Sequence, residues 1–301
     1  MTYGRILAYL AILGGSLWFG ATRAFGAFSG TVKPLSGTPA FGVSLWKPQF
    51  LPQGWENAVA RLDFVSIKIN DGSSAYTTGE KGQELAETYT RIRQLGVATH
   101  GWGWHYLDTT TDKAIQEARS AIEACRHFKL KTYYVNAEHN WTKSANPVAT
   151  MTTLVQTFRT EAPDIKLVYN SSVGPGGAPT LAPQVIHLFD VYAPMVYATT
   201  RERCAEEWRD RHAEAVKAGV PYSPMGGSGR ASDHPGRFWS YTYGPLGQIE
   251  LQRDYPAEWV VPFLGNTAGA HMLVSGNAEN PSLPEQAKLL KRASRDLLPL
   301  T

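Results

Sequence analysis

Apolar runs of strand length alternate with amphipathic segments along most of this chain. Beyond residue 40, eight short apolar runs are typical of buried strands. They cover Phe41–Trp46, Phe64–Asn70, Val97–Tyr106, Thr132–Glu138, Lys166–Ser171, Val191–Tyr197, Val220–Met225 and Trp259–Leu264. Between them, apolar residues recur at three- and four-residue steps, which predicts helices. The predicted helices are Gly82–Leu95, Asp112–Phe128, Pro147–Thr160, Glu202–Ala218 and Leu283–Leu298.

This alternation predicts an α/β fold, a (β/α)8 TIM-type barrel with some irregularity. An open doubly wound sheet is the competing fold. It usually carries an early Gly-rich turn between strand and helix, and the sequence has none. The least regular stretch is Gly226–Glu258, rich in Gly, Ser, Pro and aromatic residues. We expect a long loop there, and long ordered loops in compact domains are often functional.

The N-terminal segment has a different pattern. One early cation, Arg5, precedes the apolar stretch Ile6–Ala21, as in a signal-peptide core or a short membrane anchor. As a helix this stretch would span ~24 Å, less than the ~30 Å of a hydrocarbon layer. Ala24–Gly26 offers small residues for cleavage, and a buried helix of the main domain is the alternative. We therefore expect an exported protein with a signal peptide or anchor at 1–26, a linker at 27–40 and the barrel at 41–301.

Composition narrows the classes of function. Nine Trp and fourteen Tyr among 43% hydrophobic residues exclude a disordered chain. A net charge of +3 without a long basic run argues against nucleic-acid binding. Two cysteines exclude a disulfide framework or a thiolate zinc site, and no two histidines stand at helical ligand spacing. We expect a monomer that needs no metal and no cofactor, and that contacts a membrane only through an uncleaved N-terminal segment.

The strand ends are where a barrel of this type carries its chemistry. Here these positions hold few carboxylates and many aromatic and amide side chains. Aromatic faces stack on sugar rings, and amides hydrogen-bond to hydroxyl and acetamido groups, although aromatic residues can also simply cap the barrel core. The candidate substrate-binding residues are Trp46, Lys68, Trp104, His105, Trp141, Asn170, Met195 and Tyr197.

The fourth predicted strand is the most informative. Because side chains alternate between faces, Tyr134, Asn136 and Glu138 share one face and Val135 lies on the other. Asn136 and Glu138 then point together into the barrel mouth, where aromatic neighbours would partly remove the carboxyl from water. Such surroundings suit a general acid. The alternative is a structural Glu paired with Lys68.

The second predicted strand repeats the pattern. Alternation places Lys68 and Asn70 on one face, with Ile69 on the other. An inward Lys68 needs a carboxylate partner, which Asp71 or Glu138 could supply.

Several segments resemble the family-25 glycoside hydrolases, the cell-wall muramidases with an irregular (β/α) barrel. The resemblance runs in order through Gly42–Trp46, Asp63–Gly72, Gly103–Tyr106 and Asn136–Glu138, and it thins after that. It implies that Glu138 is the general acid, and that Asp71 stands where the family usually has a Glu.

Two positions depart from that family, which has Asp where this chain has Gly42 and Asn136. The Asn136-x-Glu138 pair is similar to that of the family-85 endo-β-N-acetylglucosaminidases. This second resemblance implies that the amide orients the 2-acetamido group of the substrate. That group attacks the anomeric carbon while Glu138 protonates the leaving oxygen, so no protein nucleophile is needed.

We therefore expect a retaining glycosidase that cleaves β-linked N-acetylhexosamine polymers, foremost peptidoglycan. Glu138 would be the acid/base and Asn136 the orienting amide, with Asp71 or Tyr197 assisting. Trp46, Trp104 and Trp141 would be stacking platforms.

Two alternatives remain open. The changes at Gly42 and Asn136 would also fit a degenerate barrel that binds glycans, or holds a cell-wall assembly together, without cleavage. The stretch Asp190–Tyr197 resembles the sixth strand of other sugar-cleaving barrels, so a hydrolase for another polysaccharide is the third possibility.

Overall fold

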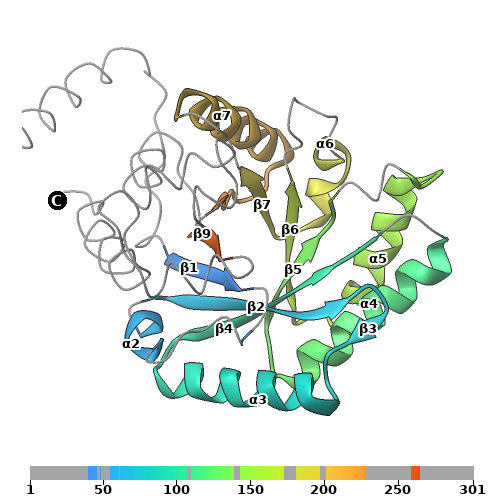
Figure 1. Cartoon of the computed structure of the whole chain (residues 1–301). Helices are drawn as coiled ribbons and strands as arrows, with labels where there is room; N and C mark the ends of the chain where they lie inside the picture. The colour runs from blue at the N-terminus through green and yellow to red at the C-terminus, as the bar shows by residue number, and fades with distance from the viewer. Residues whose placement is uncertain are drawn as a thin grey trace, which may run out of the picture. The chain divides into compact units, whose positions relative to one another are not determined.

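Eight parallel strands close into a barrel (Figure 1). The structure is a computed structural model that describes residues 40–45, 48, 55–60, 62–106, 110–138, 143–172, 181–196, 201–227 and 259–264. The ring contains β1 (Ala40–Leu45), β2 (Phe64–Asp71), β4 (Ala98–Trp104), β5 (Thr132–Asn136), β6 (Lys166–Ser172), β7 (Val191–Val196), β8 (Met225–Gly227) and β9 (Trp259–Leu264). Because β1 pairs with both β2 and β9, the ring is closed, and the predicted barrel is confirmed.

Helices follow most of these strands on the outside of the ring (Figure 1). They are α2 (Glu56–Val59), α3 (Gly79–Gln94), α4 (Thr111–His127), α5 (Pro147–Glu161), α6 (Ala182–Val185), the 3-10 turn Ile186–Leu188 and α7 (Arg201–Ala218). Sequence signals explain the start of one helix in detail. At α5, Asn146 Oδ1 accepts a hydrogen bond from the Ala149 amide, and Pro147 supplies a preset first turn. Four of the five predicted helices are confirmed; the fifth lies outside the described residues.

The alternation of strand side chains builds two apolar layers. Residues such as Ile67 and Ile69 of β2 pack outward against Leu85, Tyr89 and Ile92 of α3. Side chains from the other face fill the barrel interior. This inner cluster consists of Phe64, Trp102, Tyr134, Val168, Val191, Ala193, Met195 and Met225. Both layers are mainly apolar, so the buried polar side chains near the carboxyl ends of the strands require an explanation.

Several local features differ from the prediction. Strand β8 begins at Met225, five residues after the predicted start at Val220. The reason is the end of α7, where Gly219 has φ +70° and the Val220 amide still donates to the Ala215 carbonyl. The apolar pattern also gave no prediction for β3 (Ser74–Ala75), a short antiparallel partner of β2, or for the four-residue helices α2 and α6.

The predictions for the N-terminal segment and the linker fall on residues 1–39, outside the described part of the chain. Within the described residues, no helix has the length and apolar character needed to cross a bilayer. Most of the predicted long loop, residues 228–258, also lies outside the described part.

We expect His100 to make the fold acid-sensitive. Its ring stacks on Phe64 with 4.7 Å between centroids, and burial, followed by the charge of Lys166, lowers the pKa of His100 from 6.5 to about 3. Below pH 6.5 the unfolded chain therefore binds a proton that the folded chain does not, and stability falls by at most roughly 1.4 kcal/mol per pH unit until about pH 3. Urea unfolding between pH 7 and pH 4 should show this slope in the wild type. A His100→Gln variant should have a flatter profile, and an equal slope in both would contradict the assignment.

Candidate active site

The carboxyl ends of five neighbouring strands meet in one row. Asp71 of β2 is in register with Trp104 of β4, which is in register with Asn136 of β5. The row continues to Asn170 of β6 and Ala193 of β7. Because all five strands are parallel, these residues lie at the same end of the barrel, the end at which TIM-type barrels carry their active sites.

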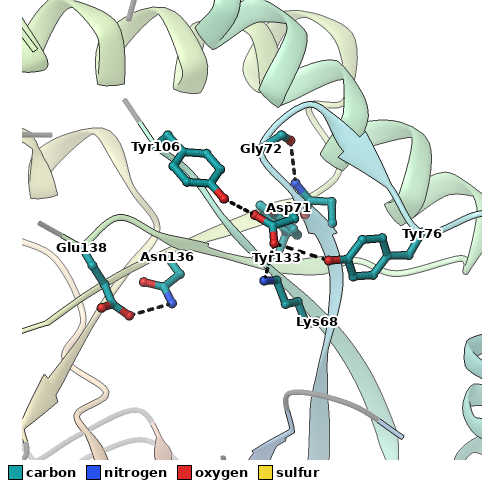
Figure 2. A network of polar contacts seen from close by, with 9 residues as sticks. Lys68, Asp71, Gly72, Tyr76, Tyr106, Tyr133, Asn136 and Glu138 are labelled. Atoms are coloured by element: carbon teal, nitrogen blue, oxygen red, sulfur yellow. Dashed lines mark hydrogen bonds and ion pairs between the residues drawn. The ribbon is translucent and has the colours of Figure 1, made fainter. Parts of the chain in front are cut away.

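Asn136 and Glu138 form the first polar group of this row. Asn136 Nδ2 donates a hydrogen bond to Glu138 Oε1 at 3.3 Å (Figure 2). The ladder continues past the end of β5, because the Ala137 amide donates to the Asn170 carbonyl at 3.0 Å. Alternation therefore extends to residue 138 and brings the two side chains together, as the sequence pattern predicted. Tyr134, two residues before Asn136, lies in the inner cluster.

The amide of Asn136 is only half satisfied. The residue is 5% exposed, and its Oδ1 is buried without a hydrogen-bond partner among the described residues. A buried carbonyl oxygen left without a donor is costly, so such an atom indicates where a ligand could donate a hydrogen bond. Glu138 is more exposed than Asn136.

Asp71 is the centre of the second polar group (Figure 2). Its Oδ2 accepts hydrogen bonds from Lys68 Nζ at 2.9 Å and from the Tyr76 hydroxyl at 3.5 Å. Its Oδ1 accepts a bond from the Tyr106 hydroxyl at 2.9 Å. Three donors therefore hold this carboxylate in one orientation. Of the two partners predicted for Lys68, the structure gives Asp71.

Aromatic rings surround this ion pair. Lys68 Nζ lies 5.5 Å from the ring centre of Trp102 and 5.9 Å from that of Trp104, within the range of cation–π contacts. Burial, followed by the neighbouring Asp71 carboxylate, raises the pKa of Tyr76 to about 12. Tyr76 therefore remains a neutral hydrogen-bond donor to Asp71 over the physiological pH range.

A β-bulge explains how Lys68 and Asp71 reach each other. Residues three apart in a regular strand point to opposite faces. Here Lys68 pairs with Trp102 and Asn70 with Gly103, so β2 has one more residue than β4 between these pairs. The extra residue reverses the alternation after Lys68, which brings Asp71 to the same face.

The bulge also overturns one expectation. The prediction that Asn70 shares a face with Lys68 is wrong: its side chain is fully buried and accepts a hydrogen bond from Tyr133 on the helix side of β5. The physical reason is the extra residue in β2. It leaves both Ile69 and Asn70 on the helix side of the strand.

The other predicted residues occupy different environments. Asn170 is buried, with Nδ2 donating to the Ala193 carbonyl at 2.6 Å, and Met195 belongs to the inner cluster. His105 joins neither the Asn136–Glu138 pair nor the group around Asp71. It is buried on the helix side, where its two ring nitrogens contact Glu117 and Tyr133. Three predicted residues lie outside the described part of the chain: Trp46, Trp141 and Tyr197.

Two contacts of the site were absent from the predicted set. Tyr106 stands two residues after the end of β4, and its place near a strand end was a usable signal. Tyr76 had no such signal, because it reaches Asp71 only through the turn after β2, where Gly72 has φ +53°. That turn also has the Tyr76 amide donating to the Ile69 carbonyl at 2.8 Å.

Gly42 shows why a carboxylate is missing from β1. It pairs with Phe64 of β2, and a Cβ built at position 42 would lie 2.3 Å from the Phe64 ring. The ring therefore fills the space that a side chain at position 42 would need. Among the described residues there is also no group of three or more His, Cys, Asp and Glu that could hold a metal ion.

We expect the Lys68–Asp71 pair to stabilise the fold. Lys68 is 5% exposed and Asp71 33% exposed, so Asp71→Asn removes the charge facing a largely desolvated ammonium. The expected loss of unfolding free energy is about 2 kcal/mol, below the range of fully buried pairs because Asp71 is partly solvated. Chemical denaturation measures it. The control is Asp164→Asn, which removes an exposed ion pair with Lys131 and should cost clearly less. Equal losses would contradict a special role for the buried pair.

The fold is similar to the barrels of several solved glycosidase structures. A chitinase domain from Pyrococcus furiosus superimposes with a TM-score of 0.58 at 10% identity, covering 88% of this chain and 98% of that one. A spore cortex-lytic enzyme from Bacillus megaterium gives 0.58 at 7% identity, with 87% and 76% covered. An endo-β-N-acetylglucosaminidase from Cordyceps militaris gives 0.56 at 9% identity, with 87% and 92% covered.

At these identities the likeness establishes the fold alone. No protein-family model matches the sequence, and no curated protein matches it. The specific resemblance to family 25 or family 85 therefore remains a prediction.

Proposed function

We propose that this protein is a glycoside hydrolase that cleaves β-linked N-acetylhexosamine polymers, with peptidoglycan as the main candidate. The observation that carries the proposal is the Asn136–Glu138 pair. A carboxyl group and a buried amide with an unsatisfied oxygen stand together at the carboxyl end of the barrel. An acetamido N–H of the substrate is the donor that Asn136 Oδ1 lacks.

The first step of the proposed reaction uses the substrate as its own nucleophile. Asn136 holds the 2-acetamido group so that its carbonyl oxygen attacks the anomeric carbon. The new carbon–oxygen bond forms as the glycosidic bond breaks, and Glu138 transfers its proton to the leaving oxygen. The product of this step is a cyclic oxazolinium intermediate, and Glu138 is left as a carboxylate.

In the second step Glu138 acts as the base. It removes a proton from a water molecule, whose oxygen attacks the anomeric carbon and opens the ring of the intermediate. The acetamido group is restored, Glu138 is protonated again, and two displacements give net retention of configuration. No carboxylate of the protein bonds to the sugar.

Two features of the site favour this route over one with a protein nucleophile. The Asp71 carboxylate already accepts three hydrogen bonds, including one from the ammonium of Lys68, which lowers its availability for bond formation. At position 42, the Phe64 ring fills the space that a second carboxylate would need. Asp71 would assist by orienting the polar groups around the sugar.

The choice of polymer rests on several supports. The barrel resembles those of a chitinase crystallised with chito-oligosaccharides and of a cortex-lytic enzyme. The expected N-terminal export segment and the net charge of +3 suit an anionic cell wall. Trp46, Trp104, Trp141 and Tyr197 remain proposed contacts to the sugar chain.

Product analysis tests the proposal. The full chain is incubated separately with peptidoglycan and with chitin, and the soluble products are examined by mass spectrometry and by an assay of new reducing ends. The expected result is a ladder of fragments whose new reducing end is an N-acetylated hexosamine. Binding of the polymer in a pull-down without new reducing ends would instead establish a degenerate, glycan-binding barrel.

A further inference from the structure

A chain of buried polar side chains runs behind the site on the helix side of the barrel. Glu117 Oε2, on α4, lies 3.1 Å from His105 Nδ1, and His105 Nε2 lies 2.7 Å from the Tyr133 hydroxyl. Tyr133 donates to Asn70 Oδ1 at 2.6 Å, and Asn70 Nδ2 donates to the Gly72 carbonyl at 3.2 Å. All four residues are at most 1% exposed. The proposed reaction uses none of them.

In this series of hydrogen bonds, the two end groups determine which atom donates and which accepts in each bond. The Gly72 carbonyl only accepts, so Asn70 presents its amino group there and its oxygen to Tyr133. Tyr133 donates its single hydroxyl proton to Asn70. The Tyr133 oxygen can therefore only accept in its contact with His105, so His105 Nε2 carries a proton and donates it. At the other end, the Tyr106 amide donates to Glu117 Oε2. One further proton must then lie between His105 Nδ1 and Glu117 Oε2.

This series of hydrogen bonds ends at the β2 bulge, which brings Asp71 to the site side of the barrel. Asn70 lies immediately before Asp71, and the Asn70 side chain spans the turn to Gly72. The chain of bonds passes over Gly103, where a Cβ would lie 1.8 Å from Asn70 Oδ1 and 2.2 Å from the Tyr133 hydroxyl. The space for the Asn70–Tyr133 bond therefore depends on the missing side chain at position 103. That bond is the one that ties the Asn70 side chain to the neighbouring β5, because its other bond, to the Gly72 carbonyl, stays within the turn after β2.

We propose that Tyr133, held by His105 and Glu117, is a positioning residue that locks the β2 bulge through Asn70. The lock keeps Asp71 on the site side of the barrel. It acts on Asp71, and through it on Lys68 and Tyr106, without touching substrate. Its effect on turnover rests on the proposed function, whereas its effect on the bulge does not.

The first test needs no substrate. In Tyr133→Phe, amide hydrogen exchange at Gly72 and Tyr76 should become at least about tenfold faster. The Gly72 amide donates to the Trp104 carbonyl of β4 just after the bulge, and the Tyr76 amide closes the following turn on the Ile69 carbonyl. The matched control is Tyr222→Phe, which removes another buried phenol bond, to the Trp208 carbonyl, across the barrel. Unchanged exchange at Gly72 and Tyr76, with a loss of global stability like that of Tyr222→Phe, would overturn the proposal.

Nitrogen NMR of the wild type gives a second, independent readout. With 15N-labelled histidine, Nε2 of His105 should carry a slowly exchanging proton, and this resonance should shift or disappear in Tyr133→Phe. If His105 Nε2 carries no proton in the folded wild-type protein, His105 cannot donate to Tyr133 and the proposed series of hydrogen bonds is wrong. This result needs only the wild type, so it holds even if the variant fails to fold.

A double-mutant cycle then separates positioning from a general structural role. Tyr133→Phe should lower turnover of the glycan about tenfold when Asp71 is present, and have almost no further effect in an Asp71→Asn background. Equal factors in both backgrounds would show that Tyr133 does not act through Asp71. If the wild type cleaves no glycan, the proposed function fails, and the exchange and NMR results still decide whether the bulge is locked.

Discussion

Replacing Glu138 by Gln should reduce glycan cleavage by about 10²- to 10⁴-fold, the range expected when a general acid is removed. Gln keeps the size of the side chain and can still contact Asn136, but it has no proton to give to the leaving oxygen. The measurement is the rate of new reducing ends from peptidoglycan or chitin, with thermal unfolding to check the fold. Binding of the polymer should persist.

A matched carboxylate outside the site provides the control. Glu87 is exposed on α3, and Glu87→Gln should leave the rate within a factor of two (roughly the size of surface-substitution effects on stability). Full activity in Glu138→Gln would remove this residue from the mechanism and with it the proposed reaction. If Glu138→Gln regains activity on a substrate whose leaving group has a low pKa, this would further support the role of Glu138 as the general acid.

Replacing Asn136 by Ala should lower turnover by about 10²- to 10³-fold, as for other preorganised hydrogen-bonding groups. The variant loses both the contact to Glu138 and the oxygen proposed to accept the acetamido N–H. A thiazoline analogue of the cyclic intermediate should bind the wild type and bind Asn136→Ala at least tenfold more weakly. This second measurement separates loss of acetamido orientation from a general loss of the fold.

The control for this variant is Gln83→Ala, which removes an exposed amide on α3 and should change neither property. Tight binding of the thiazoline by Asn136→Ala would show that another group orients the acetamido. The Asn136 amide would then serve only to hold Glu138.

The fold was largely predictable because it depends on strong local patterns. Strand-length apolar runs and helical periodicity gave seven strands of the barrel at their places, an eighth that overlaps its prediction only at Met225, and four helices. The exception, β8, was displaced because the end of α7 depends on one backbone conformation at Gly219, which apolar spacing does not encode. Boundaries of this kind follow from hydrogen bonds at helix ends.

The site was predictable only where strands are regular. Simple alternation brought Asn136 and Glu138 together, and the structure has them in contact. The same rule failed for Asn70, because one extra residue in β2 reverses the faces and no composition signal marks it. His105 was chosen for its place at a strand end, where its outward orientation against α4 could not be read from residue type.

The contact between Gly42 and Phe64 restricts how this barrel could change in evolution or by engineering. Gly42→Asp alone would drive its Cβ into the Phe64 ring, while trimming Phe64 first would open a core cavity at a cost of about 3–5 kcal/mol. Either order passes through a less stable intermediate, so the two positions are epistatic. A variant library that samples positions 42 and 64 together is therefore the way to reach a two-carboxylate version of this barrel, and single-site libraries would miss it.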